Sequence, residues 1–294
     1  MDHDFRYDLF PLAAAVKDKY AARVARGYST AAETEIVICG LARNIASVVH
    51  KTISRVEKLR GMFRNSRVII LENDSSDATP YALTGWQHSS PGVTVTCKKL
   101  NEPVNRSNRC LQRATRMASY RNMLRKLVVA DSGDLPYVIV VDTDIAGGWS
   151  PEGIASTFGQ EQAWDFVGSN GIMFRQYGGK GMIPCHYDVW AFRWAGDDTP
   201  CRPEQINPRH WARGSEMVPV NSCFGGLGIY RMEAFKQCSY DGTDCEHVPF
   251  HRKMREAGMG RLFMNPSQIV LYNNEKFDTE FAVAVGRDRG GYRR

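Results

Sequence analysis

The chain lacks any run of about 18 apolar residues, the length that a membrane-spanning helix requires. Near its start stand Asp2, Asp4 and Arg6 in place of the basic and apolar blocks of a secretory signal peptide. The eight cysteines include no Cys-x-x-Cys pair, which argues against a zinc ribbon and favours reduced thiols over a disulfide framework. We therefore expect a cytoplasmic protein without a spanning helix or a classical export signal, with a membrane surface as an additional peripheral contact.

Signatures of two further protein classes are also missing. No Gly-x-Gly-x-x-Gly follows the first predicted strand, where ICGLARN stands, and this weakens the alternative of a nucleotide-binding oxidoreductase. The 38 Lys and Arg residues are dispersed among 32 Asp and Glu residues, which weakens the alternative of a basic nucleic-acid-binding protein. The short basic end GRDRGGYRR is expected to be disordered or to contact a membrane surface. The net charge of +6 favours anionic ligands in general.

Short β-branched runs alternate with segments of helical periodicity along the first half of the chain. With 294 residues, 43% of them hydrophobic, the chain can bury a large core. Strands are expected at residues 35–44, 66–74, 93–100 and 137–144, and helices at residues 8–28, 45–63 and 113–129. This alternation predicts an α/β fold with a mostly parallel sheet flanked by helices. Residues 197–213 have no periodicity and are expected to form a long loop.

The strand YVIVVDTD ends in two aspartates one residue apart, Asp142 and Asp144. In a parallel sheet, ligands bind beyond the carboxyl ends of the strands. Two carboxylates with this spacing can share a hard divalent cation, Mg or Mn, which neutralises the oxygens of a diphosphate. A solvated turn is the alternative, and the position of the pair directly after a buried strand favours the metal site.

Polar residues also end the two earlier strands. Glu72, Asn73 and Asp74 offer acceptors for a base or a ribose, with a polar turn and helix cap as the alternative. Arg43 and Asn44 end the first strand. Arginine suits bidentate phosphate binding, so Arg43 and Arg121, which lies on the helix before the aspartates, are candidate phosphate contacts; a solvated helix face is the alternative.

Several motifs in order resemble those of the GT-A glycosyltransferases: ICGLARN, VIILENDSSDAT, ASYRN and VIVVDTDI over residues 35–150. Farther along, NSCFGGLGIYRMEAF resembles the glycine-rich acceptor-side segment of these enzymes, DCEHVPFHRKMREAG their acidic residue and following helix, and RLFMNPSQIVLYN the strand after it. The resemblance covers residues 35–275. The chain is most similar to the capsule-associated α-1,3-mannosyltransferases through ASYRN, the D-x-D strand, YDVWAFR and the Cys-Phe-Gly-Gly stretch.

This resemblance implies a GT-A fold and a metal-dependent transfer of a sugar from a nucleotide-sugar donor. The first donor implied is GDP-mannose, from which mannose is transferred, and the acceptor implied is a hydroxyl of a glycan or glycolipid. The process implied is polysaccharide synthesis, with retention of configuration at the transferred sugar favoured. The cofactor implied is a divalent metal, Mn or Mg, on Asp142 and Asp144, with His247 or His251 as a further ligand. The donor-binding residues implied are Arg43, Asn44, Glu72, Asn73, Asp74, Arg121, Asp142 and Thr143.

The catalytic carboxylate remains open between Asp244 and Glu246. Inverting relatives place a base at this element, usually within a Glu-Asp pair, whereas this chain has Glu246 followed by His247. In a retaining enzyme the leaving phosphate itself assists the acceptor, and Glu246 then positions the acceptor.

The acceptor side is assigned to an aromatic segment and a glycine pair. CHYDVWAFRW combines rings with a carboxylate, a composition that suits sugar binding, while a buried aromatic cluster is favoured for Trp190 and Phe192. The acceptor-binding candidates are Tyr187, Asp188, Gly225 and Gly226.

The expected organisation has an N-terminal helical extension (1–33) and a nucleotide-sugar-binding half (34–150). An acceptor-binding half of the same domain (151–280) and a basic C-terminal tail (281–294) follow.

Overall fold

The computed structural model describes residues 5–105, 109–176 and 182–273, and the expected tail 281–294 lies outside these ranges. The helices are α1 Lys17–Ala32, α2 Val49–Arg60, α3 Thr79–Ser89, α4 Leu111–Ser132, α5 Pro151–Phe158, α6 Pro203–Ile206, α7 Met232–Gln237 and α8 His247–Glu256, with 3-10 turns η1 Tyr7–Leu9, η2 Ala14–Val16 and η4 Val189–Ala191. The strands are β1 Glu35–Ala42, β2 Asn65–Asn73, β3 Val93–Lys98, β4 Tyr137–Asp142, β5 Gly148–Trp149, β6 Phe166–Gln176, β7 Met182–His186, β8 Arg193–Trp194, β9 Val218–Ser222, β10 Leu227–Arg231 and β11 Leu262–Leu271.

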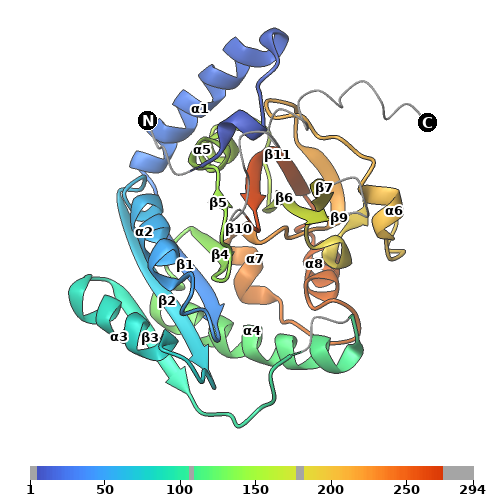
Figure 1. Cartoon of the computed structure of the whole chain (residues 1–294). Coiled ribbons are helices and arrows are strands. Elements are labelled where there is room, and N and C mark those ends of the chain that lie inside the picture. Colours follow the sequence, from blue (N-terminus) through green and yellow to red (C-terminus); the bar gives the residue numbers. More distant parts are fainter. Residues whose placement is uncertain (1–4, 106–108, 177–181, 274–294) are drawn as a thin grey trace.

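The described strands join into one twisted sheet with the order β3-β2-β1-β4-β10-β6-β11-β9-β8, while β5 pairs with β11 and β7 pairs with β6 (Figure 1). Strands β3, β2, β1 and β4 pair in parallel. Strand β10 runs antiparallel to both β4 and β6, and β11 runs parallel to β6, so β6 and β11 point the same way as β4. The predicted class, an α/β fold with a mostly parallel central sheet flanked by helices, is confirmed.

The core lies on both faces of this sheet. Successive side chains of a strand point to opposite faces, so Cys39 of β1 packs in the same cluster as Leu124 of α4, whereas Ile38 packs with Val56 of α2. Helices α4 and α7 lie side by side across the first of these faces (Figure 1). Because helices cover both faces, the carboxyl ends of the strands are the open edge at which a site can form.

The strands predicted in the first half of the chain are confirmed, and the continuous helix predicted over residues 8–28 is wrong in its first half. Pro11 has no backbone N–H and restricts the residue before it, and Phe10 accordingly leaves the helical region at φ −129° and ψ 66°. The chain is extended again at Ala13, with φ −67° and ψ 139°, and helix α1 starts at Lys17 after the turn η2. It then packs tightly on α5, because a Cβ on Gly27 would lie 1.7 Å from the carbonyl oxygen of Ala155.

All eight cysteines are free thiols. Among the helices that the structure describes, none combines the length and the hydropathy needed to cross a membrane.

Candidate functional site

The two aspartates of the DTD loop, Asp142-Thr143-Asp144, lie at the carboxyl end of β4. Asp142 is paired with Leu41 of β1 on one side, and its backbone N–H donates to the carbonyl of Gly226 on the other, at 2.9 Å. The loop is therefore held between β1 and the glycine-rich segment before β10. The prediction that these carboxylates stand at the edge of the sheet is confirmed by this position.

Thr143 anchors the loop from within. Its hydroxyl donates to the carbonyl of Leu41 at 2.6 Å, and its own carbonyl accepts from the hydroxyl of Thr52 on α2 at 2.8 Å. The side chain is buried, so Thr143 fixes the loop from inside the protein.

Two tyrosines hold the two carboxylates of the loop. The Tyr187 hydroxyl donates to Oδ2 of Asp142 at 3.0 Å, and the Tyr272 hydroxyl donates to Oδ2 of Asp144 at 3.3 Å. The two rings stack, with centroids 4.4 Å apart and planes inclined by 13°. Tyr272 was missed by the sequence analysis, although its place directly after the buried strand β11 puts it at the same sheet edge as Asp142.

Arg121 of α4 bridges two acids. Its Nε donates to Oε1 of Glu246 at 2.8 Å, and its Nη2 lies 3.5 Å from Oδ1 of Asp142. The guanidinium is buried, with its carbon 5.0 Å from the ring centroid of Phe224 and 6.0 Å from that of Tyr240. Burial opposes the charge, but the carboxylates of Glu246 and Asp142 outweigh it and raise the pKa of Arg121. This arginine was predicted to bind phosphate, whereas the structure places it between protein carboxylates.

Asp188 lies beside the glycine pair that was predicted with it on the acceptor side. Its backbone adopts a left-handed conformation at φ 60°, and its Oδ2 accepts from the N–H of Gly225 at 3.3 Å. Burial raises the pKa of Asp188 to about 7, and the negative charges of Asp142 and Glu246 act in the same direction. A positive φ is uncommon for non-glycine residues, and aspartate adopts it more readily than most of them.

Asp142, Asp144, Asp188 and Glu246 form what we call the acidic cluster. Burial, together with the nearby charge of Asp144, raises the pKa of Asp142 to about 6 in spite of Arg121, and desolvation also raises the pKa of Asp144. Burial is the largest cause of these raised pKa values, and a bound cation would favour the ionised carboxylates. No group of three or more His, Cys, Asp or Glu side chains within the described ranges is placed to hold a metal by itself.

Of the two candidate catalytic acids, only Glu246 belongs to the acidic cluster. Asp244 instead accepts from Nη2 of the buried Arg193 at 2.6 Å and from the backbone N–H of Cys245 at 2.7 Å. Glu246 precedes helix α8, with its side chain only 6% exposed.

The two candidate histidines occupy different environments. The ring of His251 is bonded on both sides, with Nδ1 2.9 Å from the hydroxyl of Ser222 and Nε2 3.1 Å from that of Tyr230. His247 stacks on Phe224, with ring centroids 4.0 Å apart, and neither of its ring nitrogens has a hydrogen-bond partner among the described residues. Burial lowers the pKa of both imidazoles, so both are neutral at physiological pH.

The carboxylate of Asp74 is used inside the protein. Its two oxygens accept from the backbone N–H groups of residues 100, 101 and 102, at 2.8, 2.9 and 3.2 Å. These bonds outweigh desolvation and lower the pKa of Asp74. Asp74 thus organises the segment after β3 and is not brought into the acidic cluster.

The other donor-side candidates also contact protein groups at the ends of β1 and β2. Arg43 donates to the carbonyls of Glu102 and Pro103, at 2.7 and 3.2 Å. The remaining contacts are Asn44 Oδ1 with the N–H of Ser76 at 2.8 Å, Glu72 Oε1 with the N–H of Ser75 at 2.9 Å, and Asn73 Nδ2 with Asp74 Oδ2 at 3.2 Å. These residues form a hydrogen-bonded rim at the same edge of the sheet as the DTD loop.

Comparison with known proteins gives similarity at the level of structure only. No protein-family model matches the chain, and no curated protein matches it. The solved structures to which it is similar include mannosyltransferase PcManGT from Pyrobaculum calidifontis in complex with GDP-Man and Mn2+ (11% identity, 89% of this chain and 68% of that chain, TM-score 0.49). Others are S. aureus TarS with UDP-GlcNAc (13% identity, 82% and 60%, TM-score 0.46) and Mycobacterium tuberculosis glucosyl-3-phosphoglycerate synthase with UDP (11%, 90% and 80%, TM-score 0.48). At these levels the similarity does not assign an activity.

Proposed function

We propose that the protein is a metal-dependent glycosyltransferase that uses a nucleotide-sugar donor. The observation that carries the proposal is the DTD loop itself. Two carboxylates stand at the carboxyl edge of the parallel strand β4, and each is oriented by a tyrosine hydroxyl, at 3.0 Å for Asp142 and 3.3 Å for Asp144. The surrounding motifs resemble those of GT-A enzymes, and this resemblance supports sugar transfer from a nucleotide donor as the reaction at these carboxylates.

The donor atoms suit Mn or Mg. Both metals prefer carboxylate oxygens, and Mg is commonly held by one or two protein carboxylates while substrate phosphates and waters complete its shell. Asp144, the more exposed of the two acids, is the proposed direct ligand, and Asp142 binds directly or through water. A divalent cation bound here would neutralise the developing charge of the departing nucleoside diphosphate.

His247 is the histidine retained as a further ligand. Both of its ring nitrogens are without a hydrogen-bond partner among the described residues, and its Nε2 lies 3.7 Å from Oε1 of Glu246. His251 is not retained, because its two ring nitrogens are already hydrogen bonded in the core.

Glu246 and Asp188 are the proposed acceptor-side groups. Arg121 Nε donates to Oε1 of Glu246 at 2.8 Å, so this oxygen is already engaged within the protein, which favours a positioning role for Glu246 and supports the retaining course. Asp188, partly buried beside Gly225, can accept a hydrogen bond from an acceptor hydroxyl when ionised or donate one when protonated. Arg121 keeps Glu246 and Asp142 in fixed relative positions.

The finer assignments follow the sequence resemblance. We propose mannose from GDP-mannose as the first donor to test and a glycan or glycolipid hydroxyl as acceptor, in polysaccharide synthesis. The strands up to β4 form the donor-binding half, and the segments from α5 to β11 form the acceptor-binding half of the same domain.

A donor screen tests the proposal. Hydrolysis of each nucleotide sugar is measured with Mn2+ on the wild type, on Asp144→Asn and on Asp18→Asn, a matched control on the exposed face of α1. We expect one donor to be hydrolysed, a loss of about 100-fold in Asp144→Asn because a ligand to the metal is removed, and no change in the control. GDP or UDP should raise the Tm only when Mn2+ is present. Stabilisation by NAD or by oligonucleotides instead would refute the assignment.

A further inference from the structure

A second arginine of α4 lies on the side of the helix that reaches the acidic cluster. Arg113 stands in the first turn of α4, eight residues before Arg121. Residues at this spacing share one broad face of a helix and are separated by about 12 Å along its axis. Because Arg121 approaches Asp142 from this face, Arg113 is placed to approach the same edge of the sheet.

The guanidinium of Arg113 is oriented by an aromatic ring. Its carbon lies 5.4 Å from the ring centroid of Trp190, which follows Asp188 by two residues. The side chain is partly buried, and it has no hydrogen bond or ion pair with any other residue that the structure describes. A ring over the face of a guanidinium limits its tilt and leaves the N–H groups at its edge free to donate.

The charge of Arg113 acts on the acid proposed to hold the metal. Desolvation raises the pKa of Asp144, and the positive charge of Arg113 opposes this rise, ahead of that of Arg121. Burial also raises the pKa of Tyr272, which donates to Asp144, and Arg113 again acts in the opposite direction. The guanidinium of Arg113 is therefore within electrostatic range of both ends of this hydrogen bond.

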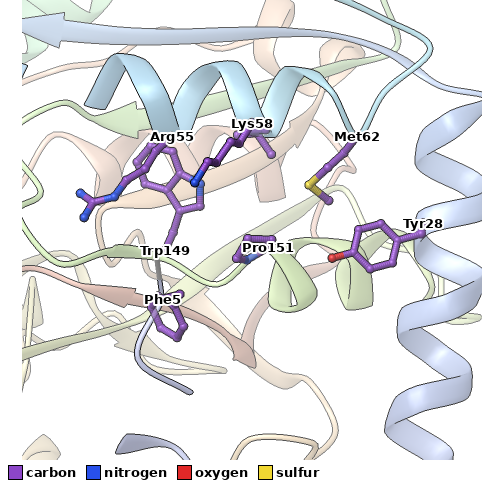
Figure 2. Close-up of a pocket in the computed structure, with 8 residues that line it drawn as sticks. Phe5, Tyr28, Arg55, Lys58, Met62, Trp149 and Pro151 are labelled. Atoms are coloured by element: carbon purple, nitrogen blue, oxygen red, sulfur yellow. The ribbon is translucent and has the colours of Figure 1, made fainter. Parts of the chain in front are cut away.

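Other arginines close to the DTD loop are already engaged. Arg121 is held between two carboxylates of the acidic cluster. Arg55 of α2 lines a cavity together with Trp149 (Figure 2). From there its guanidinium donates to the carbonyls of residues 145 and 146, at 3.0 and 2.9 Å. In contrast to these two, Arg113 keeps its N–H groups available to a ligand.

A diphosphate is the ligand that this position suits. A departing nucleoside diphosphate carries roughly three negative charges near neutral pH, and a divalent metal offsets two of them. The planar fork of an arginine pairs with phosphate oxygens through charge-assisted hydrogen bonds. We propose that Arg113 binds the diphosphate of the nucleotide donor, next to the metal at the DTD loop. This inference rests on the proposed function and deepens it, because the phosphate contact predicted for Arg121 passes to Arg113.

Calorimetric titration of the full-length protein with GDP and with UDP, each in the presence of Mn2+, tests the proposal. We expect one of the two nucleotides to bind the wild type. Arg113→Met keeps an apolar stem over Trp190 but removes the charge, and it should raise the Kd of that nucleotide about tenfold. Arg113→Lys keeps the charge without the planar fork and should raise the Kd about threefold. Lys126→Met, on the exposed face of α4, is the matched control and should leave the Kd unchanged.

The affinity for Mn2+ alone separates a phosphate contact from a structural role. Arg113 repels a cation at Asp144, so Arg113→Met should bind Mn2+ without nucleotide at least as tightly as the wild type does, as measured by electron paramagnetic resonance. Weaker binding of both Mn2+ and nucleotide in this variant, or an equal loss of nucleotide affinity in Lys126→Met, overturns the proposal. An equal nucleotide Kd in Arg113→Met and the wild type overturns this role alone. A wild type that binds neither nucleotide overturns the transferase assignment together with it.

Discussion

Tyr187 and Tyr272 stack face to face and direct their hydroxyls to different carboxylates of one loop, Tyr187 to Asp142 and Tyr272 to Asp144. The two residues come from distant parts of the chain, one after β7 and one after β11. Their stack fixes the spacing of the hydroxyls, and the hydroxyls in turn fix the orientation of the carboxylates. Groups that orient metal ligands commonly set metal affinity.

Removal of either hydroxyl should therefore weaken metal binding while the stack is kept. We expect Tyr272→Phe and Tyr187→Phe each to raise the Kd for Mn2+ about tenfold, because the carboxylate loses its fixed orientation. Electron paramagnetic resonance of free Mn2+ measures the affinity. Tyr81→Phe is the control, since Tyr81 is 86% exposed and lies on α3. Unchanged Mn2+ affinity in both phenylalanine variants would show that the hydroxyls do not orient the ligands.

The ion pair of Arg121 with Glu246 should be essential to stability. Arg121→Met leaves buried negative charge unpaired, and we expect a loss of about 3 kcal/mol in the free energy of unfolding near pH 7.5. The double variant Arg121→Met with Glu246→Gln should recover part of this loss, because the uncompensated charge is removed. Urea denaturation measures both. Arg64→Met is the control, since Arg64 is 57% exposed in its pair with Glu35 and should cost less than about 1 kcal/mol. No recovery in the double variant would assign the loss to packing.

The buried His251 predicts a specific acid sensitivity. Burial lowers its pKa from 6.5 to about 3, so in this window the unfolded chain binds a proton that the folded protein does not. The contribution of His251 is therefore fully present above about pH 6.5 and declines as the pH falls, by about 1.4 kcal/mol per pH unit. His247, Asp142 and Asp188 also have shifted pKa values in the window between about pH 7 and pH 5, so the contribution of His251 is read from denaturation as a difference in slope from wild type and from the exposed-site control His88→Gln. In His251→Gln the free energy of unfolding should fall less steeply with decreasing pH than in the other two proteins. Parallel slopes in the three proteins would contradict a contribution from His251.

Gly226 should resist substitution more than a glycine of similar backbone conformation elsewhere. Its φ is 89°, and a Cβ would lie 3.1 Å from Ile145 and Val270 and 3.3 Å from the ring of Tyr187. Gly196 has a φ of 78° with nothing within 4 Å of its Cβ position, so Gly196→Ala measures the backbone strain alone, about 1 kcal/mol. We expect Gly226→Ala to lower the free energy of unfolding by about 1–2 kcal/mol more than Gly196→Ala does, as measured by thermal denaturation. Donor hydrolysis should also fall, because the new methyl group displaces the Gly226 carbonyl that accepts from the backbone N–H of Asp142. Equal losses of stability in the two variants would show that the close contacts of Gly226 add nothing to the backbone strain.

Residues at strand ends show that the hydrophobic pattern of the sequence predicts the position of a side chain but not its partners. The buried runs before Asp74 and before Asp142 look alike in the sequence, and both predicted a polar tip at the sheet edge. In the structure the Asp74 oxygens accept three backbone N–H groups of residues 100–102, whereas Asp142 meets Tyr187 and Arg121 and has a raised pKa. Helical periodicity in the first residues was misleading for a local reason, since Pro11 interrupts a pattern whose spacing is otherwise helical.

By itself the sequence determined the four strands of the first half of the chain and that Asp142 and Asp144 follow one of them, because apolar runs and polar tips are local properties of the chain. Only the tertiary structure decided that Glu246 and not Asp244 joins them, that Arg121 is held between acids, and that Tyr272 orients Asp144. These choices depend on which side chains meet across long stretches of sequence. Burial and hydrogen-bond partners, which set charge and orientation at such a meeting point, exist only once the chain has folded.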